Sequence, residues 1–206
     1  MTISLWELGL YAVGLAVLWV TPGPVWVALL ARGMSGGFQA AWPLAVGVTI
    51  GDALWPLVAI YGLTWIVERF ASFMLVLHVI AALTFVTFGL LLIRHADKGI
   101  TADSRLTRPG MWAGFATGVA VVIGNPKAIL FYMGVLPGFF DLTRVGGPDI
   151  AAIVVLSVVV PLIGNLALAA SLGALRSLLT SPAALRRMNI GAGVLMILVG
   201  VAIAVI

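Results

Sequence analysis

The sequence predicts an all-α, polytopic membrane protein with six transmembrane helices, arranged as two inverted three-helix repeats. Hydrophobic residues make up 63% of the 206 residues and charged residues only 9%, whereas a soluble domain carries roughly 25% charged residues. So few charges could not cover a globular surface in water. Two further observations give the helix count and the repeat: the spacing of the charges along the chain, and a match between its two halves.

Four stretches of the chain contain no Asp, Glu, Lys or Arg, and each is long enough to span a bilayer. Crossing the ~30 Å hydrocarbon core takes about 20 residues at a rise of 1.5 Å per residue. The four stretches are 8–31, 70–93, 150–175 and 188–206. Two more stretches, 38–67 and 109–140, contain a single charge each.

We therefore expect helices over about 5–31, 38–63, 71–93, 111–136, 150–174 and 187–206. The short connections leave no room for a soluble domain, so residues 1–206 are expected to form one transmembrane domain. The first repeat is expected over about 1–93 and the second over about 111–206, with a polar cytoplasmic linker over about 94–110. The first apolar run is too long for the core of a signal peptide, so we expect it to be retained as a span.

The two halves of the chain match around a proline. Residues 14–30, GLAVLWVTPGPVWVALL, align with residues 118–134, GVAVVIGNPKAILFYMG, at an offset of 104. This alignment places Pro22 on Pro126. Some identity arises by chance in apolar sequence, but the matched prolines favour a duplication.

A weaker match at an offset of 105 places Pro56 on Pro161 and Asp52 on Ser157. Each half of the chain would contain three helices, which is an odd number. The second half would therefore enter the membrane from the opposite side. Inverted repeats of this kind are characteristic of secondary transporters.

Lysine and arginine are divided unevenly between the loops on the two sides of the membrane. The tendency of positive residues to remain in the cytoplasm places the richer side there and both termini outside. The richer side has eight, Arg32, Arg94, Lys98, Arg105, Arg108, Arg176, Arg186 and Arg187, and the other side has two, Arg69 and Arg144. The net charge of +4 then faces anionic lipid, and no nucleic-acid partner is expected.

Asp52 and Lys127 are the two charged residues that fall deep inside predicted spans. A charge at the bilayer centre costs at least about 2.5–3.5 kcal/mol on insertion scales, so such residues usually face a bundle interior or a cavity. The two could be partners, because each is near the middle of its helix. A substrate or proton site is the functional interpretation, and an ion pair that only fixes helix packing is the alternative.

Prolines predict breaks in two of the helices, at a depth similar to that of the two charges. Thr21-Pro22-Gly23-Pro24 and Asn125-Pro126 should interrupt their helices, because proline lacks a backbone donor and clashes with the preceding turn. The freed backbone groups must be satisfied by protein or by water in a cavity. Half-helix N-termini favour a carboxylate and unwound carbonyls favour a cation, and an amino-acid zwitterion offers both. Two ordinary proline kinks are the alternative.

The sequence lacks the residues of common catalytic and metal sites. There are no cysteines, which excludes disulfides and thiolate ligands, and no HExxH or P-loop motif occurs. We expect no enzyme activity, no metal and no cofactor. His78 lies in an otherwise uncharged predicted helix, where packing is the simpler interpretation and a proton relay the other. His95 lies in a predicted loop.

These motifs resemble those of the LysE/RhtB (lysine exporter, homoserine/threonine resistance) family of amino-acid exporters, over nearly the whole chain. The resemblance rests on Thr21-Pro22-Gly23-Pro24, Ser35-Gly36-Gly37, Gly47, Gly51-Asp52, Asn125-Pro126-Lys127-Ala128 and Pro137-Gly138-Phe139. It implies a bacterial inner-membrane exporter driven by the proton gradient. In the family, polar residues often follow TPGP and a Gln is common at the position of Gly138. Val25-Trp26 and Gly138 therefore predict a more apolar pathway here.

We expect a secondary active exporter of amino acids or related small metabolites, with protons, the lipid bilayer and a small amino-acid-like molecule as its partners. Asp52 would carry the coupling proton. The substrate would bind between the repeats at Thr21, Pro22, Gly23, Pro24, Asn125, Pro126 and Lys127. A passive small-solute channel and a structural membrane subunit are the alternatives, and the residues leave the substrate and a homo-oligomer open.

Overall fold

The computed structural model describes residues 1–21, 23–67 and 108–179, with scattered residues between 79 and 96 and between 181 and 201. All regular elements of this described part are helical, which confirms the all-α class. They are α1 (Leu5–Val20), α2 (Pro24–Val67), α4 (Met111–Ile123), α5 (Pro126–Leu130), the π-helix η1 (Phe131–Val135), α6 (Leu136–Phe139) and α7 (Gly147–Leu179). His78 lies outside the described residues, and the expected helices 71–93 and 187–206 and the linker 94–110 fall largely outside them.

The chain is a membrane protein by the length and composition of its helices. Pro24–Gly62 and Gly147–Leu172 are each long and apolar enough to cross a membrane. A third candidate span is Met111–Ile123 together with Pro126–Phe139, a pair that is bent by 47° at its break. The count of six spans and the inverted repeat stay predictions.

A turn divides α2 into two parts. A straight helix of its 44 residues would be about 66 Å long, roughly twice the thickness of the hydrocarbon core. Gly36 (φ −155°, ψ 21°) and Gly37 (φ 66°, ψ −159°) leave the helical conformation, and the positive φ of Gly37 favours glycine. The first part of α2 continues the predicted helix 5–31 beyond its break, and the second part corresponds to the predicted helix 38–63.

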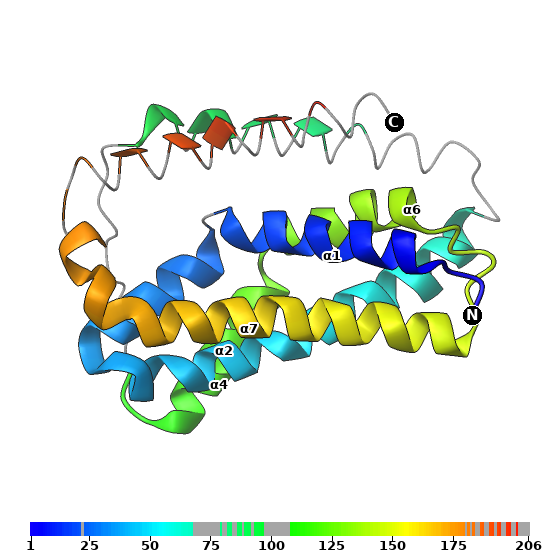
Figure 1. Cartoon of the computed structure of the whole chain (residues 1–206). Helices are drawn as coiled ribbons and strands as arrows, with labels where there is room; N and C mark the ends of the chain where they lie inside the picture. Colours follow the sequence, from blue (N-terminus) through cyan, green and yellow to red (C-terminus); the bar gives the residue numbers. More distant parts are fainter. Residues whose placement is uncertain are drawn as a thin grey trace.

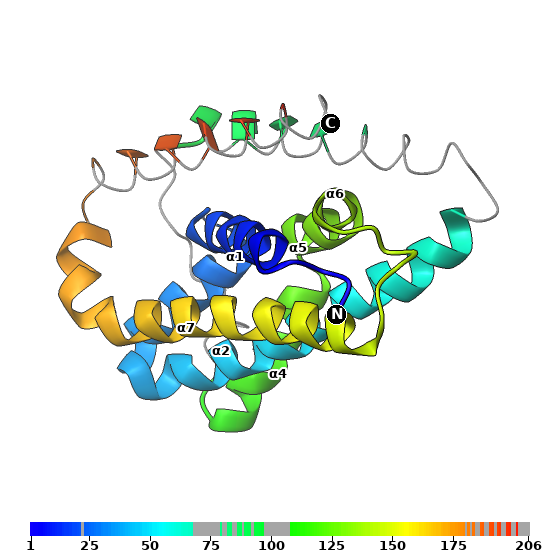
Figure 2. The same ribbon diagram turned by 45° about the vertical axis from the view of Figure 1, so that its right-hand side comes forward.

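One end of the bundle gathers the N-terminus, α6, the start of α7 and the end of α2 (Figure 1), and the turned view in Figure 2 shows the same grouping. Asp149 ties this end together, because its carboxylate accepts a hydrogen bond of 3.0 Å from the backbone N–H of Thr2. Near the turn inside α2, Arg32 donates to the carbonyls of Ala40 (2.8 Å) and Gly110 (3.0 Å). Both buried charges thus join segments that are far apart in the sequence.

Two apolar clusters form the core. The Tyr11 cluster lies between α1, α2, η1, α6 and α7 and consists of Tyr11, Leu15, Ala59, Ile60, Ala128, Phe131, Tyr132, Leu136, Phe140 and Ile153. The Leu44 cluster lies between α2, α4 and α7 and consists of Ala28, Leu29, Leu30, Ala41, Leu44, Ala45, Val48, Val122, Leu168, Ala169 and Leu172.

Glycines bring α2 and α4 into direct backbone contact. A Cβ atom at Gly47 would lie 2.1 Å from the carbonyl oxygen of Phe115, and one at Gly118 would lie 2.2 Å from the carbonyl oxygen of Leu44. No side chain fits at such distances. Small residues at helix interfaces allow this close approach in membranes, where apolar burial alone does not hold helices together.

Gly47→Ala should therefore destabilise the protein, because the new methyl group must push α2 away from α4. Overpacking of this kind typically costs about 1–3 kcal/mol. Thermal unfolding of detergent-purified protein measures the effect. Gly62→Ala on the same helix is the matched control, since the nearest atom to its Cβ position is 3.9 Å away. Equal melting temperatures for the two variants would contradict the packing described here.

Candidate functional site at two facing helix breaks

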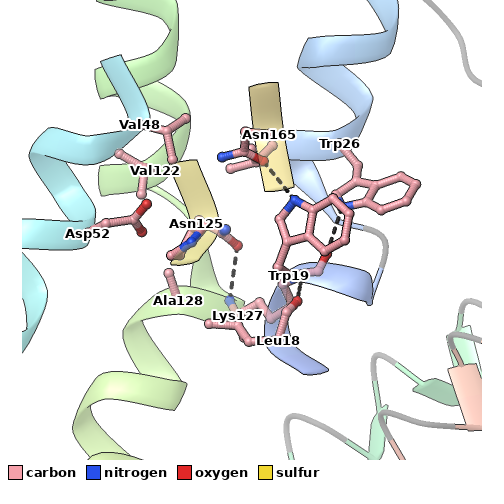
Figure 3. A pocket seen from close by; sticks show the side chains of 12 residues that line it. Leu18, Trp19, Trp26, Val48, Asp52, Val122, Asn125, Lys127, Ala128 and Asn165 are labelled. Atoms are coloured by element: carbon pink, nitrogen blue, oxygen red, sulfur yellow. Dashed lines mark hydrogen bonds between the residues drawn. The ribbon is translucent and has the colours of Figure 1, made fainter. Parts of the chain in front are cut away.

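A buried cavity lies where the two proline-containing breaks meet (Figure 3). It contains about 400 Å³ of space between atoms, a figure that includes the open space at its mouth. Its walls come from α1, α2, α4, α5 and α7, on either side of the two breaks. They are formed by Leu18, Trp19, Val25, Trp26, Val48, Asp52, Val122, Asn125, Lys127, Ala128, Pro161 and Asn165.

The first break leaves the last carbonyls of α1 without helical donors. The carbonyl of Leu18 would normally accept from the N–H of residue 22, but that residue is Pro22 and has none. The carbonyl of Trp19 instead accepts a hydrogen bond of 2.7 Å from the indole N–H of Trp26. The break that the prolines predict inside the expected span 5–31 is therefore confirmed, because α1 ends at Val20 and α2 begins at Pro24.

The second break is capped by its own side chain. α4 ends at Ile123, and α5 begins at Pro126. The side-chain oxygen of Asn125 accepts a hydrogen bond of 3.2 Å from the backbone N–H of Lys127, which satisfies one of the free donors at the start of α5.

Lys127 joins the two breaks. Its ammonium group donates to the carbonyl oxygen of Leu18 at 2.8 Å and also to the carbonyl oxygen of Thr21. A Cβ atom at Gly23 would lie 3.3 Å from the Cε and Nζ atoms of Lys127, so the glycine leaves room for this side chain. The cation from the second break thus satisfies carbonyls that the first break has freed.

Asp52 lies in the same cavity but makes no such contact. It is 5% exposed, and within the described part of the chain its Oδ2 atom has no hydrogen-bond partner. The described residues show no ion pair between Asp52 and Lys127, although the sequence made them candidate partners. The physical reason is that the freed carbonyls of α1 hold the ammonium group. A buried carboxylate without a partner is costly, so Asp52 is suited to bind a proton or a cation.

Two tryptophans form one wall of the cavity. The rings of Trp19 and Trp26 lie 5.6 Å apart at 44°, and the indole N–H of Trp19 donates to the side-chain oxygen of Asn165 at 3.1 Å. Trp19 packs so closely on α7 that a Cβ atom at Gly164 would lie 2.4 Å from its ring. Sequence reasoning missed Trp19 and Asn165, because it followed charges and prolines. An amide inside an otherwise apolar helix was the signal available for Asn165.

The structure brings most of the predicted site residues together. Asn125, Lys127 and Asp52 line the cavity, and Thr21 and Gly23 contact the Lys127 side chain from the first break. The remaining predicted residues are prolines: Pro24 and Pro126 begin α2 and α5, and Pro22 lies outside the described residues.

The residues that depart from the family pattern divide into two groups. Val25 and Trp26 both line the cavity, whereas Gly138 does not. Together with Val48 and Val122, the first pair makes most of the wall apolar around a few polar groups.

A membrane protein whose helices break around a buried, partly charged cavity has the architecture of a membrane translocator. The family model described as LysE type translocator matches residues 16–205, and the chain belongs to this family. The family indicates a transporter rather than an enzyme.

Curated relatives show the same relationship. The chain is 32% identical over 171 residues to an uncharacterized membrane protein of Synechocystis sp., a match that covers 82% of each chain. It is 27% identical over 135 residues to the leucine efflux protein of Salmonella typhimurium, covering 65% of this chain and 63% of that protein. It is also 30% identical over 113 residues to the chemotactic transduction protein ChpE of Pseudomonas aeruginosa, covering 55% of each. No solved structure matches the chain.

Lys127→Met should destabilise the protein, because it leaves the carbonyls of Leu18 and Thr21 without their donor. Losing hydrogen bonds to a charged group and leaving buried carbonyls unpaired costs about 2 kcal/mol or more. Pro22→Ala should recover part of this loss, because an N–H at residue 22 can donate to Leu18. A double-mutant cycle of thermal unfolding tests the coupling. Strictly additive effects would mean that Lys127 does not compensate for the proline.

Proposed function

We propose that this protein is a secondary active transporter that exports amino acids or related small metabolites from the cytoplasm, coupled to protons. The observation that carries the proposal is the cavity at the facing breaks, which contains a buried acid and a buried base that are not paired with each other. Membrane proteins rarely keep such groups in a span unless they handle an ion or a substrate.

A zwitterion matches the polar groups of the cavity. A lysine ammonium has three donors, and two of those on Lys127 bind the carbonyls of Leu18 and Thr21. The third donor, with the side-chain NH₂ of Asn125, would hold the carboxylate of an amino acid. Its α-ammonium would pair with Asp52, and an aliphatic side chain would lie against the apolar wall. The name of the leucine efflux protein among the relatives supports an amino-acid substrate.

Competition for Asp52 would couple export to protons. In the inward-facing state, Asp52 would release its proton and bind the ammonium group of the substrate. In the outward-facing state, the substrate would leave and a proton would take its place on the carboxylate. The protein would change between the two states only when Asp52 holds either the substrate ammonium group or a proton. One proton would therefore enter for each substrate molecule exported.

The packing between the two halves of the chain supports two inverted repeats within one transmembrane domain. It also supports a transport mechanism by alternating access, in which the cavity opens to one side of the membrane at a time. Gly118 of α4 packs on Leu44 of α2, and Gly164 of α7 packs on Trp19 of α1. Each broken helix thus lies against the long helix of the other half, as a twofold relation would require. Rocking of one repeat against the other would move the cavity between the two sides. The charge asymmetry of the loops supports the inner membrane with both termini in the periplasm.

Cells that express the protein should accumulate amino acids in the medium, above the level of cells that express Lys127→Met. Metabolite profiling of the medium identifies the substrate, and the apolar wall predicts aliphatic amino acids among the enriched compounds. Membrane levels of both proteins are measured to normalise the comparison. Identical media would contradict the exporter proposal.

Asp52→Asn should remove the response to a pH gradient in proteoliposomes. The amide neither binds a proton nor releases one, so any flux that remains should be the same with and without the gradient. The gradient-driven rate of the variant should be lower than that of the wild type by about tenfold or more. Asp52→Glu is the control that keeps the carboxyl group. Unchanged gradient-driven export in Asp52→Asn would contradict the proton role, and flux that never saturates would indicate a channel.

A further inference from the structure

Three buried hydroxyl groups lie inside the Tyr11 cluster. The hydroxyl oxygens of Tyr11 and Ser157 are 2.5 Å apart, and the Ser157 hydroxyl also donates to the carbonyl of Ile153 at 2.7 Å. All of Tyr11, Ser157 and Tyr132 are 0% exposed. The cluster is otherwise apolar, so these hydroxyls are its unusual feature.

The Tyr132 hydroxyl lies near this pair and also interacts with Asp52. In the described part of the chain, Asp52 Oδ2 and the Tyr132 hydroxyl are the two buried side-chain polar atoms without a hydrogen-bond partner. The Asp52 carboxylate interacts electrostatically with both tyrosines, and the Ser157 hydroxyl lies beside that of Tyr132. Tyr132 belongs to the π-helix η1, and π-helical turns frequently occur at functional sites.

The polar groups around Asp52 come from each of the elements packed there. They are Lys127 from α5, Tyr132 from η1, Tyr11 from α1 and Asn165 from α7, and Ser157 of α7 lies beside the two tyrosines. The freed carbonyls of α1 hold Lys127. On the side of Tyr11, the hydroxyl groups are therefore the groups left that could exchange a proton with Asp52.

The hydroxyls lead away from the cavity toward the end of the bundle that holds the N-terminus. Tyr11 is about 15 Å along the chain direction of α1 from the break at Thr21. Aromatic rings close this region, since Tyr11 packs edge-to-face on Phe139 (5.5 Å) and Phe140 (5.2 Å). An amino acid could not pass between these rings, but a proton could move along hydroxyl groups.

We propose that Tyr132, Ser157 and Tyr11 form the route by which Asp52 exchanges its proton with the side of the membrane where the N-terminus lies. This inference rests on the proposed function, because it assigns the path to the residue that carries the coupling proton. Each hydroxyl oxygen accepts one proton and releases the one it carried, directly or through a water, so the hydroxyls are unchanged and one proton reaches the carboxylate.

A purely structural role explains these hydroxyls less well. Phenylalanine would fill the site of Tyr132 with nearly the same volume, and it would remove a buried hydroxyl that has no partner. Ser157 also falls at the position that the sequence match pairs with Asp52. Both halves would then place an exchangeable group at the same point of the repeat.

The test uses the full-length protein in proteoliposomes, with a mixture of the ¹⁴C-labelled protein amino acids as the probe. Two rates are measured: transport driven by an imposed pH gradient, and exchange of labelled for unlabelled amino acid without a gradient. Tyr132→Phe and Ser157→Ala should each lower the gradient-driven rate by about tenfold or more, since positioned proton-transfer groups typically contribute roughly 10²–10⁴-fold. Exchange should stay within about twofold of the wild-type rate, because the substrate contacts remain. Tyr61→Phe, at a tyrosine that is 65% exposed, is the matched control and should change neither rate.

The outcomes separate the route from the function on which it rests. Wild-type gradient-driven rates in both Tyr132→Phe and Ser157→Ala, with the gradient response lost in Asp52→Asn, would overturn the route and leave the proposed function standing. Equal loss of exchange and of gradient-driven transport would also overturn it, because that result indicates a structural role. Wild-type protein that carries no probe amino acid, or that ignores the gradient, would overturn the proposed function and the route together.

Discussion

Backbone carbonyls that lose their helical donors inside a membrane need another partner, and this requirement shapes the centre of the protein. Pro22 removes the donor for the carbonyl of Leu18, and no lipid can replace it. The ammonium group of Lys127 reaches across from the second break and binds Leu18 and Thr21. The two breaks are therefore held together by one cation, and the position of each depends on the other.

This use of Lys127 explains the state of Asp52. The carbonyls of Leu18 and Thr21 take two of the three ammonium donors and hold the cation at the first break. Asp52 Oδ2 stays without a hydrogen-bond partner among the described residues, in a cavity whose walls are mostly apolar. In the proposed mechanism, a substrate ammonium group or a proton on the carboxylate relieves this cost. Close glycine contacts between α2 and α4 keep the cavity compact, so small changes in helix packing would change access to it.

The sequence predicts the all-α class and the two breaks correctly, because proline inside an apolar chain has strong and local physical consequences. It also singles out Asp52 and Lys127 by their charge, and the structure places both in the wall of one cavity. It does not predict that Lys127 binds carbonyls rather than Asp52, because that choice depends on how two distant helices meet. The indole of Trp26 as a cap for Trp19 is likewise a tertiary contact with no local signal, and the amide of Asn165 gives a signal for burial but not for its place in the cavity wall. From the sequence, Tyr132 would be interpreted as a packing residue, because the burial of its hydroxyl group is known only from the structure.

The contact between Lys127 and the first break can be measured directly, because the chain contains only two lysines, Lys98 and Lys127. In Lys98→Arg protein reconstituted in lipid, with ¹⁵Nζ-lysine and ¹³C′-threonine labels, solid-state NMR reports the distance from Lys127 Nζ to nearby threonine carbonyls. A hydrogen bond to Thr21 predicts dephasing for a distance of about 4 Å or less, which Thr21→Ser should abolish. Absence of dephasing, or dephasing that survives Thr21→Ser, would contradict the shared cation on which the rest depends.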